Sequence, residues 1–179
     1  MKNRSIKSQG LFITLALIVG VIAVLSVVEA QEATTESADY EIMFTKWATC
    51  YSEQKECETS DGSMVVATME GVITGGDTGT GSFSGEVLEV IQSTPELWEA
   101  VPIYQIHGTI HEFSAHILVI ENPEAGEATL VGIITDGWLK GQTVQGTYKF
   151  VSSCPDNPAQ PPAEMSLCIE VTLHVHADD

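Results

Sequence analysis

Histidine is the residue type in this sequence best suited to chemistry, and three of the five histidines fall within IHGTIHEFSAH (106–116). Imidazole nitrogens bind Zn²⁺ and Cu²⁺, so this stretch first raises the hypothesis of a metal site. A period-two pattern over 103–113 predicts a strand that carries His107 and His111 on its outer, more polar face. Residues four apart on a strand are separated by about 13 Å, so these two histidines cannot bind one ion by themselves.

A second pair, His174 and His176, is better spaced for a metal ion. Two residues apart on a strand, these side chains share one face at a separation of about 7 Å. Glu170 on the same face could supply a carboxylate ligand, and His107 or His111 could join them if the two strands were neighbours. Our first expectation is that these histidines are solvated and that no cofactor is bound, with a surface Zn²⁺ or Cu²⁺ site as the alternative.

The first thirty residues have the layout of a secretory signal. Three basic residues precede the apolar run 11–28, and small residues stand at the −3 and −1 positions of a cleavage site after Ala30. The run is also long enough to span a bilayer, so an uncleaved membrane anchor is the alternative. We therefore expect a signal over 1–30, a flexible acidic linker over 31–39 and one extracytoplasmic domain over 40–179.

The charge balance after residue 30 excludes one class of partner. The segment 31–179 contains four lysines, no arginine and 24 acidic residues, a formal net charge of −20. Such a surface repels nucleic acid and anionic membranes, so we expect no nucleic-acid partner and no membrane contact beyond the possible anchor.

The four cysteines predict disulfides. An even number of cysteines outside the cytoplasm is typical of a covalent framework, and three pairings are possible. Proximity in the sequence favours Cys50–Cys57 and Cys154–Cys168, because each closes a short loop rich in turn residues. Their spacings do not match the ligand pairs of a zinc site.

Alternation of apolar and polar residues predicts an all-β chain. We expect one helical turn at 93–100 and eight antiparallel strands closing into a barrel, with a β-sandwich as the alternative. The predicted strands are 39–49, 64–73, 83–91, 102–113, 114–121, 128–135, 142–151 and 165–177.

Glycines punctuate several of these strands, as in GTGSFSGEV, YQIHGTI and ITDGWLKGQTVQGTYKF. These runs resemble the strands of small barrels in the allene oxide cyclase and dirigent group. The resemblance covers most of 64–151 and rests on the recurrence of glycines along the strands. No catalytic residue of that group is matched here. It implies a barrel whose relatives bind or steer small apolar molecules.

An eight-stranded barrel is the size that is either filled by side chains or holds one small ligand. Parity predicts that Tyr104, Ile106, Tyr148 and Phe150 line the interior. The leading hypothesis is thus a secreted, non-catalytic barrel that binds a small, mostly apolar molecule or serves an extracellular structural role. The alternatives are a metal-binding protein and an isomerase- or cyclase-like enzyme for a small apolar substrate. The enzyme would need a polar cluster inside the barrel, where His116 is the expected histidine.

Overall fold

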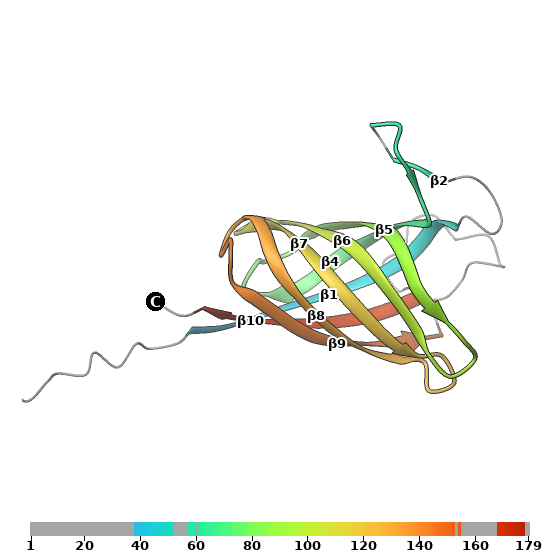
Figure 1. The fold of residues 1–179 in the computed structure, drawn as a ribbon. Coiled ribbons are helices and arrows are strands. Elements are labelled where there is room, and N and C mark those ends of the chain that lie inside the picture. The colour runs from blue at the N-terminus through green and yellow to red at the C-terminus, as the bar shows by residue number, and fades with distance from the viewer. Residues whose placement is uncertain (1–37, 52–56, 60, 153, 155–167, 178–179) are drawn as a thin grey trace, which may run out of the picture. The chain divides into compact units, whose positions relative to one another are not determined.

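The structure, a computed structural model, describes residues 38–51, 57–59, 61–152, 154 and 168–177, and within them it is an all-β protein (Figure 1). Eight strands form a closed antiparallel barrel in the order β1-β10-β9-β8-β7-β6-β5-β4, with β4 paired back to β1. The predicted barrel is therefore confirmed, and the closure rules out the alternative sandwich. The strands are β1 (Ala38–Tyr51), β2 (Cys57–Glu58), β3 (Met64–Val65), β4 (Ala67–Gly76), β5 (Gly81–Ser93), β6 (Trp98–Gly108), β7 (Glu112–Asn122), β8 (Glu127–Gly137), β9 (Thr143–Val151) and β10 (Cys168–Ala177).

The predicted signal over 1–30 lies outside the described residues, as does the predicted linker up to residue 37. β1 already begins at Ala38, so the last two residues of that linker belong to the barrel. The described part of the chain contains no helix whose length and hydropathy would let it span a bilayer.

Period-two alternation explains which face of each strand is buried. In β10, Val171, Leu173 and Val175 are buried and the residues between them face outward, as the sequence pattern predicts. The other barrel strands alternate in the same way. Their inward aromatic and branched side chains form one core that fills most of the interior. Only limited space is left for a ligand.

The predicted helical turn at 93–100 is wrong. Ser93 ends β5 and Trp98 begins β6 as its direct partner, so this segment is a hairpin. The Thr94 side chain accepts a hydrogen bond from the Leu97 amide at 3.1 Å, which closes the turn without a helix.

The boundary between the fourth and fifth predicted strands is also wrong. The chain turns at 109–111, where the Gly108 amide donates to the His111 carbonyl at 3.1 Å, and Phe113 already belongs to β7. Gly108 permits the turn because a Cβ there would lie 2.7 Å from the His111 carbonyl oxygen. The shift reverses the predicted face of Phe113, which is buried.

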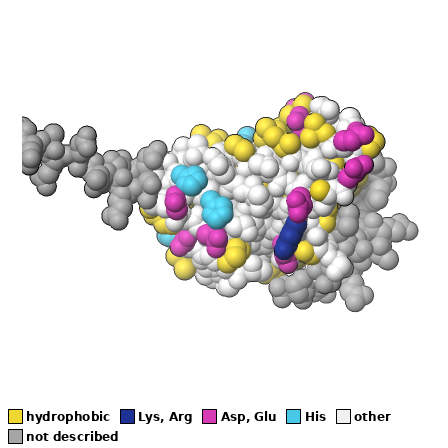
Figure 2. All heavy atoms as spheres, turned by 90° about the horizontal axis from the view of Figure 1, so that it is seen from below, with side chains coloured by type: hydrophobic (Ala, Val, Ile, Leu, Met, Phe, Trp, Pro, Cys, Tyr) yellow, Lys and Arg dark blue, Asp and Glu magenta, His cyan; other side chains and the backbone are white. Residues whose placement is uncertain are grey.

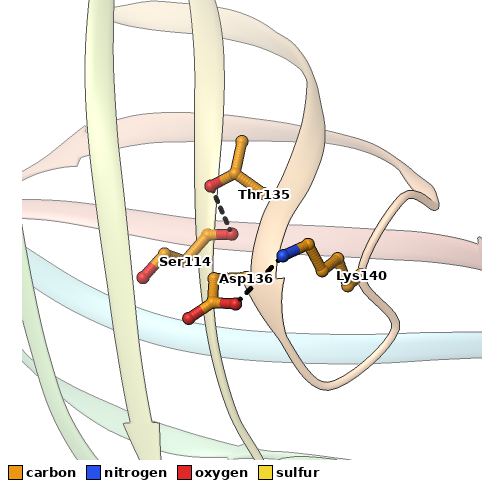
Figure 3. A network of polar contacts seen from close by, with 4 residues as sticks. All are labelled: Ser114, Thr135, Asp136 and Lys140. Carbon is orange, nitrogen blue, oxygen red and sulfur yellow. Dashed lines mark hydrogen bonds and ion pairs between the residues drawn. The ribbon is translucent and has the colours of Figure 1, made fainter.

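The β7–β8 ladder contains a register shift between Ser114 and Ala115. There the Thr135 hydroxyl donates to the Ser114 carbonyl at 3.2 Å, and on the neighbouring outer surface Lys140 contacts Asp136 at 3.3 Å (Figure 3). Thr135 is the extra residue, so the bulge belongs to β8 and bends that strand, while the buried residues of β7 keep their alternation.

Both expected disulfides are present, Cys50–Cys57 and Cys154–Cys168. The first packs with Val65 beside the small β2–β3 sheet, which the sequence did not predict as a separate element. The second joins Cys154 to the buried first residue of β10. Two such bonds in a chain of this size indicate folding in an oxidising, extracytoplasmic compartment.

Removing the Cys154–Cys168 bond by the double substitution Cys154→Ala/Cys168→Ala is expected to lower the free energy of unfolding by about 3 kcal/mol, because the bond restricts the unfolded chain. The matched pair Cys50→Ala/Cys57→Ala closes a shorter loop and should cost slightly less. Urea unfolding of the three proteins, followed by tryptophan fluorescence, measures both losses. An unchanged midpoint in the first variant would contradict the expectation.

Candidate functional site

The inner face of β1 carries a lysine. Ile42 and Phe44 point into the barrel, and the same parity places Lys46 inside, where its residue is 2% exposed. Its register partners are Gly71 on β4 and Ile169 on β10. Lysine is almost never fully buried unless it is paired, so this position calls for an explanation.

Two tyrosines hold the Lys46 amine. Nζ donates a hydrogen bond to the hydroxyl of Tyr104 on β6, and it lies 4.6 Å from the centre of that ring. The ring of Tyr148 on β9 is 4.9 Å away. Aromatic faces attract a cation, so both rings stabilise the ammonium form of the side chain. Among the described residues no carboxylate forms an ion pair with Lys46.

A carboxylate is linked to Lys46 through Tyr148. The Tyr148 hydroxyl donates to Oε2 of Glu121, which lies near the end of β7 and is partly buried. Side chains from β1, β6, β7 and β9 thus converge in one polar cluster, Lys46, Tyr104, Tyr148 and Glu121. We refer to these four residues as the Lys46 cluster.

Burial dominates the electrostatics of the cluster. Removal from water lowers the pKa of Lys46 from its ordinary value of 10.5 to about 7, although the charge of Glu121 opposes the shift. Burial also raises the pKa of Tyr104 and of Tyr148 well above that of an exposed phenol. Near neutral pH, Lys46 is therefore divided between ammonium and free amine while both phenols keep their protons.

A cavity of about 90 Å³ adjoins the cluster. It lies towards the end of the barrel that holds the β5–β6 and β7–β8 turns, which we call the cavity end. Apart from the Lys46 cluster its walls are apolar: Met69, Val87, Trp98, Pro102, Val119 and Ile169. The volume suits a group of a few heavy atoms, since a cavity of about 150 Å³ holds benzene.

A larger groove of about 610 Å³ shares part of the same wall. It is lined by Glu121 and Tyr148 together with outward-facing residues such as Thr129, Thr147 and Glu170. The hydrogen-bonded pair Tyr148–Glu121 therefore lies between the inner cavity and the surface groove. A small molecule reaching Lys46 from the groove would have to pass this pair.

The four predicted lining residues are all placed on the inner side of their strands. Tyr104 and Tyr148 line the cavity, whereas Ile106 is part of the packed core. Phe150 is half-buried and packs against Tyr148 at a ring distance of 5.8 Å. Whether any of them contacts a ligand stays a prediction.

The histidines do not assemble into one site. His107 and His116 are exposed on β6 and β7, and His111 lies in the turn between them, stacked on Trp138 at 4.0 Å. His116 faces outward between the buried Ala115 and Ile117, so it is absent from the interior polar cluster that it was expected to join.

The pair on β10 faces outward as predicted. His176 Nδ1 lies 2.6 Å from a carboxylate oxygen of Asp39, and His174 lies opposite Glu41 on β1. Figure 2 shows histidine side chains beside acidic ones on one face of the barrel. β10 and β6 lie on opposite sides of the ring of strands, so His107 is remote from this pair, and the His111 ring is stacked on Trp138. In the described residues no group of three or more His, Cys, Asp or Glu side chains is arranged to hold a metal ion.

Lys46 and Glu121 were not predicted from the sequence as site residues. The signal for Lys46 was present, because DYEIMFTKWAT repeats inward residues at every second position and Lys46 continues that series. Glu121 carried no such signal, since its role depends on where Tyr148 lies across two strand pairings.

Comparison of the chain with protein-family models, with curated proteins and with solved structures gives no match. The resemblance to the allene oxide cyclase and dirigent group is thus supported at the level of the eight-stranded barrel and identifies no family. The site must be interpreted from its own chemistry.

That chemistry is limited and specific. The Lys46 cluster offers one amine that titrates near neutral pH, two phenol hydroxyls and one carboxylate, around a small apolar cavity. Such a set can hold the polar end of a small molecule while the apolar walls hold the remainder.

Proposed function

We propose that this protein is a secreted β-barrel that binds a small, mostly apolar molecule in the cavity beside Lys46, without converting it. The observation that carries the proposal is a buried lysine with no carboxylate partner among the described residues, placed at the wall of a cavity in an otherwise filled barrel. Placing such a group in the interior weakens the fold, and perturbed groups of this kind cluster at binding and active sites.

The shape of the cavity supports a ligand with one polar end. Lys46 and the two tyrosine hydroxyls form one side, and aliphatic and aromatic side chains form the rest. Each buried CH₂ group of a ligand contributes about 0.8 kcal/mol, so a four-carbon molecule should bind with a Kd on the order of millimolar. Tighter binding requires further contacts, for which the groove beyond Tyr148–Glu121 has room.

Binding can be tested with butan-1-ol and the methionine methyl groups. Met69 lines the cavity, whereas Met43 and Met64 are 38% and 59% exposed on the outside. In protein labelled with ¹³C at the methionine methyls, the Met69 resonance is expected to shift saturably with butan-1-ol, and those of Met43 and Met64 to stay in place.

Substitutions at one lining and one outer position sharpen this test. Val87→Phe fills the cavity and should abolish the Met69 shift, while Val131→Phe on the outer face of β8 should leave it intact. A Met69 resonance in the unsubstituted protein that does not respond would overturn the proposal. Recovery of a chemically altered alcohol would favour an enzyme over a binding protein.

A further inference from the structure

Lys46 differs from the other described lysines in every respect that governs amine reactivity. Lys140 contacts Asp136 at 3.3 Å and Lys149 contacts Glu170 at 3.0 Å, and both side chains are more than half exposed. They are hydrated ammonium groups with an anion beside them. Lys46 is buried, lies between two phenol rings and faces the cavity.

We infer that Lys46 is a covalent carbonyl-binding site, whose amine condenses with a small aliphatic aldehyde or ketone in the cavity to form a reversible imine. The inference rests on the proposed function, and it names the ligand class for that cavity. It also explains why an amine, which weakens the fold, stands where an apolar side chain would pack well.

The amine can act as a nucleophile at neutral pH. Only a free amine attacks a carbonyl carbon, and an exposed lysine is in that form about once in a few thousand molecules at pH 7. Because burial lowers the pKa of Lys46 to about 7, roughly half of the molecules carry the free amine at that pH.

The condensation needs no group that the site lacks. The nitrogen lone pair of Lys46 attacks the carbonyl carbon, the C–O π bond breaks, and a proton passes from nitrogen to oxygen to give a carbinolamine. The second nitrogen proton and the hydroxyl then leave as water while the C=N bond forms. No oxidant or reductant is consumed. The Tyr104 hydroxyl, hydrogen-bonded to Nζ, is placed to pass protons between nitrogen and oxygen.

The walls of the cavity favour the imine once it forms. Imines hydrolyse in water, and the apolar side chains of Met69, Val87 and Val119 around Lys46 keep bulk water away. The cavity of about 90 Å³ limits the carbonyl compound to a few heavy atoms or to the end of a longer chain. Large sugars and aromatic polycycles do not fit.

The test compares butanal with butan-1-ol, which have the same chain but of which only butanal can form an imine. The full-length protein is incubated at pH 7 with each compound and sodium cyanoborohydride, which converts an imine to a stable secondary amine. Intact mass and peptide mapping then locate any added butyl group. We expect butanal to label Lys46 at least about a hundred times faster than Lys140 or Lys149, because a much larger fraction of Lys46 is in the free amine form at pH 7.

Two variants and the methionine signals separate the possible failures. Lys46→Met should abolish the fast labelling, and Lys140→Met, at an exposed position that lines neither the cavity nor the groove, should leave it unchanged. If Met69 responds to both compounds but Lys46 is labelled no faster than the other lysines, the imine is wrong and the binding function stands. If Met69 responds to neither compound and no fast labelling occurs, both are wrong.

Discussion

Replacing Lys46 with methionine is expected to stabilise the protein at pH 6, raising its free energy of unfolding by about 2–4 kcal/mol. Burial lowers the pKa of Lys46 from 10.5 to about 7, and a shift of that size corresponds to about 5 kcal/mol of lost stability when the pH is below both values. Methionine fills the same space without a charge, but it leaves the Tyr104 hydroxyl without its partner, which costs about 1–3 kcal/mol.

The sign of the pH dependence follows from proton binding. Between pH 7 and 10 the unfolded chain keeps the Lys46 proton and the folded protein has lost it, so the stability of the unsubstituted protein rises with pH. The advantage of Lys46→Met should therefore shrink by about 3 kcal/mol between pH 6 and 9.5. Above pH 10 the stability of both proteins falls as the pH rises. The pKa values of Tyr104 and Tyr148 are raised in the folded protein, so the unfolded chain loses phenol protons that the folded protein keeps.

Urea unfolding at a series of pH values, with the disulfides intact, measures this difference. Lys149→Met is the matched control, because that lysine is exposed and paired with Glu170, and its loss should change stability by less than about 1 kcal/mol at every pH. A Lys46→Met advantage that stays constant from pH 6 to 9.5 would show that Lys46 is charged throughout, and would remove the free amine on which imine formation depends.

Replacing Phe83 with alanine is expected to lower the free energy of unfolding by about 3–5 kcal/mol. Phe83 is buried on β5, stacks on Phe44 with ring centres 4.6 Å apart, and meets the edge of Tyr104 at 5.1 Å. Gly85 makes room for the ring, since a Cβ there would lie 2.9 Å from its Cζ. The substitution therefore leaves a void beside the ring that holds Lys46.

Ile91→Ala on the same strand is the comparison, because Ile91 is 54% exposed and its truncation should cost about 0.5 kcal/mol or less. Thermal and urea unfolding give the two losses. Labelling by butanal should also slow in Phe83→Ala, as Tyr104 loses the contact that fixes its ring. Equal losses for the two variants would mean that the aromatic group is not an important part of the core.

The sequence predicted the barrel because its main signal is local. Alternation in β10 and the hairpin turns are encoded within ten or so residues, and the short spacings of the cysteines favoured the pairings that the structure shows. The error at 109–111 has the same origin. A turn shifted by a few residues preserves most of an alternating pattern but reverses the face of Phe113 and makes Ile110 an exposed turn residue.

The Lys46 cluster could not be predicted in the same way. Its members come from four strands, and Tyr148 meets Glu121 only through the registers of β7 with β8 and of β8 with β9. Alternation alone places Lys46 inside, but the general exposure of lysine argues against that assignment. Three histidines are close in sequence, whereas the four residues of the Lys46 cluster come together only when the barrel closes.

The closing pair of strands has a consequence for the production of this protein. β1 pairs with β10 along its length, from Ala38 opposite Ala177 to Trp47 opposite Cys168. One edge of β1 therefore stays unpaired until β10 has been synthesised. Folding must then be late and concerted, dominated by contacts between distant residues, which makes it slow. Exposed strand edges invite association during that delay, and we expect the mutual repulsion of the 25 acidic residues to oppose it.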